Sequence, residues 1–254
     1  NTLFAADDVQ NKVYALELAE IPDETGNLQS VPYNLVGFGS QLAAFFEVSP
    51  FDITYHDLAV HPVTKTAFVS LSMSGKDGDQ SALVMVSPQG EIANLDYQTL
   101  TYTRVDIAEP ADPDVTFWRD IPAPTLSVTD FEFDDGQLYV AGLSNGEFAS
   151  TLRSISYPFD AGVETTSIEM FHTAHNQNET RAPIRAMALV DLDGEKTMVA
   201  AYTCTPLVTI PVDALENGAH VVGNTVAELG YGNRPLEVLS LTAYNMERQP
   251  EQFV

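Results

Sequence analysis

Two histidines three positions apart, His172 and His175, are the residues whose spacing most suggests chemistry. Imidazoles at this spacing on a loop or a single helical turn can ligate copper or another transition metal. No further His or Cys lies nearby in the sequence, so two solvated loop histidines are the alternative interpretation. The residues that follow add polar groups that binding loops often carry: Asn176, Asn178, Glu179 and Arg181.

Cys204 is the chain's single cysteine, and it lies in Tyr202–Pro206, a predicted tight connection between two strands. A catalytic cysteine needs a base that generates its thiolate, and His172 or His175 would have to reach it. The alternative is a buried, inert thiol. One cysteine excludes an intrachain disulfide and a Cys-based zinc or Fe–S site, and without a C-x-x-C-H motif no covalent c-type haem is expected.

The charge of the chain limits the classes of partner that it can bind. It carries 36 acidic and 11 basic residues, for a net charge of −25. Such a surface repels nucleic acid and anionic lipid, and no apolar run is long enough to span a membrane. The strongly acidic composition predicts a periplasmic or extracellular protein. The chain starts at Asn1 and shows no signal peptide, so either a leader has been removed or the start of the chain is missing.

The stretch 55–86 predicts three consecutive short strands, because runs rich in apolar and β-branched residues alternate with polar turns. The same unit recurs at 129–155 and 184–210, and a last copy is predicted to begin with a strand at Leu236–Leu241. Residues 35–46 are ambiguous between a strand and a short helix. The proline-rich stretch 97–127 is expected to be an insertion.

The segments that carry this repeat are LFAADDVQNKVYALEL, HDLAVHPVTKTAFVSLS, TDFEFDDGQLYVAGLS and RAMALVDLDGEKTMVAAYT. They resemble bacterial β-propeller proteins with YVTN- or NHL-like repeats and the quinoprotein-amine-dehydrogenase-like group. The resemblance implies an all-β chain, residues 1–254, that folds as one propeller of four-stranded antiparallel blades around a channel. About four to five repeats are visible, which indicates part of a six- or seven-bladed protein. A four-bladed ring or a two-sheet sandwich are the alternatives.

The resemblance further implies that the first strand of each blade lines the channel and that ligands bind on its axis. Aligned repeats place Asp57, Asp130 and Glu237 at one level, with His56 and Arg185 one residue earlier, at the mouth. Converging carboxylates would form a site for a divalent cation such as calcium, or a general-base cluster. Alternatively, each aspartate bonds the backbone of the neighbouring blade.

Two functions follow from these features. No catalytic motif is recognisable, which favours a binding or protein-interaction module for a protein partner or a small-molecule ligand. The alternative is a propeller enzyme, either a metal-dependent hydrolase or an oxidoreductase, with its site in the channel.

Overall fold

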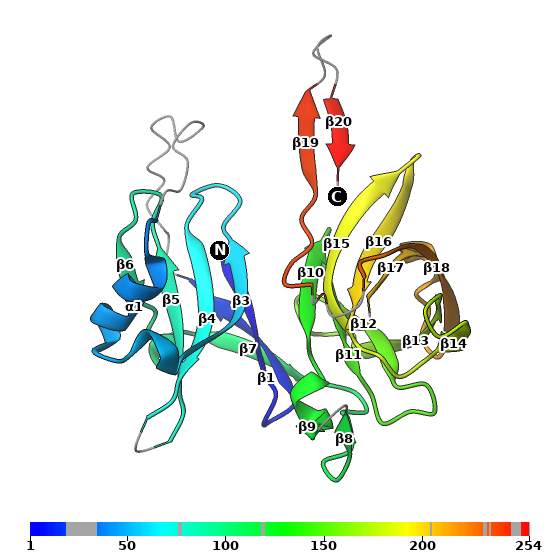
Figure 1. Cartoon of the computed structure of the whole chain (residues 1–254), viewed down its shortest axis with the longest axis horizontal. Coiled ribbons are helices and arrows are strands. Elements are labelled where there is room, and N and C mark those ends of the chain that lie inside the picture. The colour runs from blue at the N-terminus through cyan, green and yellow to red at the C-terminus, as the bar shows by residue number, and fades with distance from the viewer. Residues whose placement is uncertain are drawn as a thin grey trace. The chain divides into compact units, whose positions relative to one another are not determined.

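The computed structural model describes residues 1–18, 35–75, 78–117, 120–203, 205–230, 233, 235–244 and 250–253, of which 241–244 and 250–253 are described by their backbone alone. As predicted, this part of the chain is all-β, with a single α-helix (Figure 1). It divides into two compact units. Unit 1 comprises Asn1–Leu3 and Leu16–Tyr102, and unit 2 comprises Phe4–Ala15 and Thr103–Val254.

Unit 1 is built on the sheet predicted at 55–86. Its antiparallel strands follow one another in the order β3 (Ile53–Val60), β4 (Ala67–Met73), β5 (Gln80–Val86) and β6 (Ile92–Asn94). The ambiguous stretch forms helix α1 (Phe38–Phe46), which contributes Leu42 to a core with Leu71 and Val84 of the sheet. The helix is short because Gly37 before it and Glu47 after it both adopt left-handed backbone conformations. Short 3-10 turns, η2 (Pro50–Asp52) and η3 (Tyr97–Thr99), complete the unit.

A separate sheet has three strands. Its order is β1 (Thr2–Asp7), β2 (Lys12–Glu17) and β7 (Tyr102–Asp106). In unit 2, Val13 of β2 packs with Ile107 and with Leu138.

The proline-rich stretch predicted as an insertion contains only short elements in its described part, namely β8 (Thr116–Phe117), β9 (Ile121–Pro122) and η4 (Ala123–Leu126), besides η3 and β7. From Thr103 onward the stretch belongs to unit 2, and Arg153, a fully buried side chain, contacts its backbone. The guanidinium donates to the carbonyls of Ala108, Ser127 and Leu143 at 2.9–3.0 Å. Burial lowers the pKa of Arg153 to about 10, against the opposing charge of Glu109. These carbonyls offset part of the cost of burying a cation.

Unit 2 contains two four-stranded antiparallel meanders. The first runs through β10 (Asp130–Asp134), β11 (Gln137–Leu143), β12 (Ser150–Ser156) and β13 (Val163–His172). The second runs through β15 (Ile184–Leu192), β16 (Glu195–Tyr202), β17 (Pro206–Pro211, followed by η5, Val212–Ala214) and β18 (His220–Glu228). Both open with an Asp-Gly turn in left-handed conformation, at Asp135-Gly136 and Asp193-Gly194, which is the expected hairpin chemistry.

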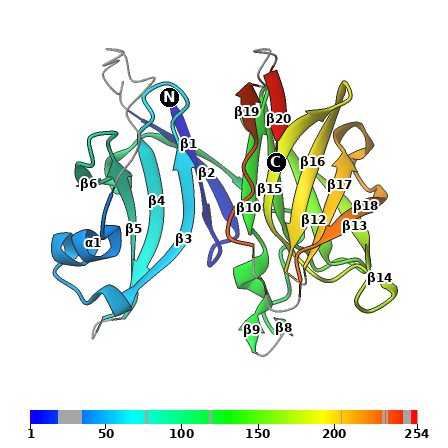
Figure 2. The same cartoon turned by 45° about the horizontal axis from the view of Figure 1, so that its top comes forward.

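The outer strands of the two meanders pair with each other in parallel, at a junction that we call the β13–β18 seam (Figure 2). Ser167–Met170 of β13 pair with His220–Gly223 of β18. On its other side β18 packs closely against β17, because a Cβ on Gly223 would lie 2.5 Å from Val208 Cγ1, a space that only glycine leaves free.

The first strands of the two meanders, β10 and β15, nearly close the sheet into an eight-stranded barrel-like structure. Side chains of β10 join them, because Asp130 and Glu132 accept hydrogen bonds from the backbone N–H groups of Met187 and Leu189. Between the meanders lies a buried core that includes Leu152, Ile168, Met170, Met187, Met198, Tyr202 and Ile210. Each such aliphatic side chain contributes about 1.5–3 kcal/mol by leaving water.

The prediction of a strand at Leu236–Leu241 is wrong, because residues 235–240 form no strand. β19 (Leu241–Tyr244) begins at the residue where the predicted strand should end. β19 pairs with β20 (Pro250–Phe253). Among the residues that the structure describes, no helix has the length and apolar character needed to cross a membrane.

Candidate metal centre

The two histidines of the sequence motif lie where β13 turns back on itself. β13 ends at His172, the turn contains His175, and β14 (Gln177–Glu179) pairs antiparallel with the end of β13. Alternate residues of β13 face the core, so His172 points inward like Met170. Glu179 lies opposite Met170 in the hairpin and therefore shares this face.

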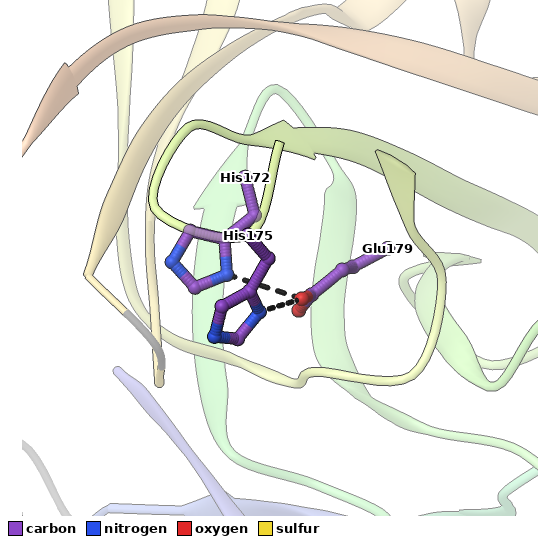
Figure 3. A group of neighbouring side chains, drawn as sticks. All are labelled: His172, His175 and Glu179. Atoms are coloured by element: carbon purple, nitrogen blue, oxygen red, sulfur yellow. Dashed lines mark hydrogen bonds and ion pairs between the residues drawn. The ribbon is translucent and has the colours of Figure 1, made fainter. Parts of the chain in front are cut away.

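The hairpin brings three potential ligand side chains together (Figure 3). One ligand atom from each of His172, His175 and Glu179 lies within 4.8 Å of the others. Glu179 Oε1 accepts a short hydrogen bond from His175 Nδ1 and lies 3.2 Å from His172 Nδ1. The ring centroids of the two imidazoles are 4.1 Å apart. Both Nδ1 atoms thus face the same carboxylate.

His172 is the buried member of this group. Its side chain is 4% exposed, against 16% for Glu179 and 53% for His175. His172 Nδ1 is a buried polar atom that lies 3.2 Å from Glu179 Oε1, but this contact does not have hydrogen-bond geometry. Leaving such an atom without a hydrogen bond costs about 1–3 kcal/mol. A metal ion between the three side chains would give this nitrogen the well-directed contact that Glu179 does not provide.

The carboxylate is held in its charged form. Burial alone would raise the pKa of Glu179, but its contacts with His175 and His172 outweigh burial and lower the pKa. A deprotonated carboxylate beside two imidazoles is the state in which these groups bind a metal ion.

A second carboxylate, that of Glu228 at the end of β18, lies behind His172. It accepts hydrogen bonds from the Thr173 N–H at 2.8 Å and from the Thr205 hydroxyl, and it lies 3.9 Å from His172 Nε2. Burial would raise the pKa of Glu228, but the bonds from Thr205 and Thr173 lower it instead. Glu228 therefore faces the nitrogen of His172 that is turned away from Glu179.

The donor set defines which ions fit. Two imidazole nitrogens and one carboxylate oxygen suit zinc, copper or Fe(II). They do not suit calcium, which takes six to eight oxygen ligands. Three protein ligands leave at least one coordination position for water or another molecule.

The channel candidates of unit 1, His56 and Asp57, lie on β3 and are exposed. His56 Nε2 contacts Ser72 Oγ at 2.9 Å, and Asp57 Oδ1 accepts a hydrogen bond from the Leu58 N–H at 2.7 Å.

The channel candidates of unit 2 have different surroundings. Asp130 is buried, and its carboxylate accepts hydrogen bonds from the N–H groups of Phe131 (2.8 Å) and Met187 (2.6 Å). Its bond to the neighbouring meander is the one that the backbone-bonding interpretation predicts. Arg185 lies on β15, and Glu237 is exposed in the stretch without a strand. Burial raises the pKa of Glu132, and the charge of Glu237 adds to this effect.

Two sequence candidates remain. Arg181 is exposed at the bend after β14, and Cys204 lies outside the described residues. Sequence reasoning noted Glu179 only as a neighbouring polar group and missed Glu228. The sequence does carry one signal for Glu179, the pattern H-x2-H-x3-E, because a tight hairpin at 173–176 would place all three side chains together. It carries none for Glu228, 55 positions after Thr173.

Comparison of the chain with protein-family models, with curated proteins and with solved structures found no match.

Proposed function

We propose that the protein is a periplasmic or extracellular binding module that holds a divalent transition-metal ion through His172, His175 and Glu179. The observation that carries the proposal is the convergence of these three side chains around a buried imidazole nitrogen that has no hydrogen-bond partner. The open coordination position is where a small-molecule ligand or a side chain of a protein partner would complete the shell.

The scaffold in this proposal is of the β-propeller type. Three four-stranded meanders support it, β3–β6, β10–β13 and β15–β18, as does the bond of Asp130 to the neighbouring first strand. The acidic composition supports a location outside the cytoplasm, where such a surface keeps a protein soluble.

A second candidate function is metal-dependent catalysis, by a hydrolase or an oxidoreductase. The three-ligand set favours it, because catalytic metal sites keep a position open whereas structural zinc sites are closed by four protein ligands. Two histidines and one carboxylate hold zinc in hydrolases and Fe(II) in oxygenases. The metal that co-purifies therefore separates the two reaction classes.

The test is metal binding by the purified protein. We expect about one zinc, copper or iron ion per chain by mass spectrometry of the metals, and a Co²⁺ complex with an absorption spectrum of low coordination number. His175→Ala is the best variant, because this side chain is half exposed and its loss leaves the core intact. It should weaken zinc binding at least tenfold.

His220→Ala is the matched control. His220 also contacts a glutamate of β13, but it lies outside the ligand group. Equal zinc affinity of the wild type and His175→Ala would contradict the proposal.

A further inference from the structure

The metal centre lies at the end of the β13–β18 seam where the backbone pairing stops. The parallel pairs end at Met170 and Gly223. Beyond them, the end of β13 pairs with β14, and the end of β18 pairs with β17. Next to His172, β13 and β18 are therefore held together by groups other than their paired backbones.

Side chains of β18 provide these groups. The Thr225 hydroxyl donates to the Phe171 carbonyl at 2.7 Å, and Glu228 accepts from the Thr173 N–H at 2.8 Å. The two contacts are therefore made by the residues directly before and after His172 in the chain. The turn that carries the ligands is thus attached to the second meander through β18.

Glu228 is itself fixed in place. Thr205, between β16 and β17, adopts a φ of 89°, which is rare for a β-branched residue, and its hydroxyl donates to Glu228 Oε2. The Thr205 carbonyl also accepts from the Leu229 N–H at 2.8 Å. The carboxylate is therefore held by both meanders and has little freedom to turn away from His172.

From these contacts we infer that Glu228 is a positioning residue for the metal centre, and that an ion bound at His172, His175 and Glu179 fastens this end of the seam. An ion bound at Nδ1 leaves the proton of the neutral imidazole on Nε2, which lies 3.9 Å from the Glu228 carboxylate, so the charge of Glu228 supports the orientation of the ring that metal binding requires. This inference rests on the proposed metal site and names its outer partner.

The coupling is reciprocal. If Glu228 raises the affinity of the ligands for the ion by orienting His172, the bound ion stabilises the contact between the turn and β18 by the same factor. Metal binding should therefore reduce the motion of β18 as well as that of the β13–β14 hairpin that supplies the ligands.

The test compares Glu228→Gln with Glu169→Gln. Glu169 also sits on the seam and contacts a histidine, His220, at 3.2 Å, but it is not part of the metal group. Zinc affinity is measured by competition with a chelator. We expect Glu228→Gln to bind zinc about 10- to 100-fold more weakly and Glu169→Gln to bind it like the wild type. The Co²⁺ spectrum of Glu228→Gln should keep its shape, because all three ligands remain.

Hydrogen exchange gives the second measurement. Zinc should slow exchange of the amides at 224–228 in the wild type and in Glu169→Gln, but much less in Glu228→Gln. Zinc affinity unchanged in Glu228→Gln, or protection confined to the β13–β14 hairpin, would overturn the inference and leave the metal site standing. A wild type that binds no zinc, copper or iron would overturn the proposed function and this inference together.

If Glu228→Gln does not fold, Thr205→Val replaces it. This change keeps the β-branched shape and removes the hydroxyl that holds Glu228. Zinc binding should weaken in Thr205→Val and recover in Thr205→Ser, which keeps the hydroxyl. Equal affinity of the two variants and the wild type would also count against a positioning role.

Discussion

The β13–β18 seam has a histidine–glutamate contact at each end. The two histidines differ in burial and in whether both imidazole nitrogens have hydrogen-bond partners. At one end His220 is one-third exposed, and its nitrogens contact Ser167 Oγ at 2.9 Å and Glu169 Oε2 at 3.2 Å. The ring of Phe148 stacks against it, with the centroids 4.2 Å apart. Both nitrogens of this imidazole have partners.

At the other end His172 is buried, its Nδ1 has no hydrogen-bond partner, and a second imidazole converges on the same carboxylate. The difference follows from the alternation of side chains, because even-numbered residues of β13 are buried from Thr166 to His172, whereas His220 of β18 pairs with the odd-numbered Ser167 and shares its more exposed face. A histidine with both nitrogens satisfied on a surface serves the pairing of strands. A buried histidine with an unsatisfied nitrogen beside other ligands is the better candidate for metal binding.

The largest expected effect that separates the two ends is stabilisation by zinc. At a free zinc concentration one hundred times the dissociation constant, the free energy of unfolding of the wild type should rise by about 2.7 kcal/mol. His175→Ala, which binds zinc at least tenfold more weakly, should gain about 1.4 kcal/mol or less at the same concentration, whereas His220→Ala should gain as much as the wild type. Urea denaturation with and without zinc measures this. If the stabilisation by zinc is lost in His220→Ala, the ion binds at the His220 end of the seam and not at the His172 end.

A smaller effect is expected from crowding β18 against β17, its neighbour in the second meander, between the two ends of the seam. Gly223→Ala places a methyl group 2.5 Å from Val208 Cγ1 and 3.2 Å from Ile210 Cγ1, both on β17. Relieving this overlap should cost about 1–3 kcal/mol of stability. Gly218→Ala tests general tolerance to such a change, since a Cβ there meets no atom within 4 Å, although its positive φ disfavours alanine. If Gly223→Ala is as stable as the wild type, β18 packs against β17 more loosely than these distances indicate.

The smallest effect concerns acid stability of the metal-free protein. The pKa of Glu179 is lowered in the folded state, so its charged form contributes stability above the unfolded value of about 4.3, and this contribution is lost as the pH falls through the folded pKa. Glu179→Gln should therefore lose stability less steeply below about pH 5. Glu169→Gln controls for the loss of one charge. Parallel acid profiles for Glu179→Gln and the wild type would show that the carboxylate gains nothing from the histidines.

Much of the fold was predictable because it depends on local chemistry. Runs of alternating or apolar β-branched residues between Asp-Gly turns specify hairpins, and the predicted strands at 55–86, 129–155 and 184–210 are present. The stretch 236–241 shows the limit of this reasoning, since its apolar residues match the pattern but form no strand before Leu241. Strand formation there depends on partners that a pattern does not contain.

The aspartates of the repeat show the same limit within one motif. Asp57 and Asp130 occupy equivalent positions, and each accepts a hydrogen bond from the next residue's N–H. Asp130 is buried and also accepts from β15, whereas Asp57 is exposed on β3. An alignment of repeats predicts the shared local bond, but burial is set by the neighbouring elements.

The sequence by itself determined an all-β chain of repeated hairpins, a strongly acidic surface and a pair of histidines with a glutamate at short spacing, because each of these depends on residue type and on separations of a few positions. The tertiary structure decided that β13 and β18 pair in parallel, that His172 faces the core, and that Glu228 stands behind it. Those features join residues more than fifty positions apart, and such contacts are fixed by packing of whole sheets rather than by local preference.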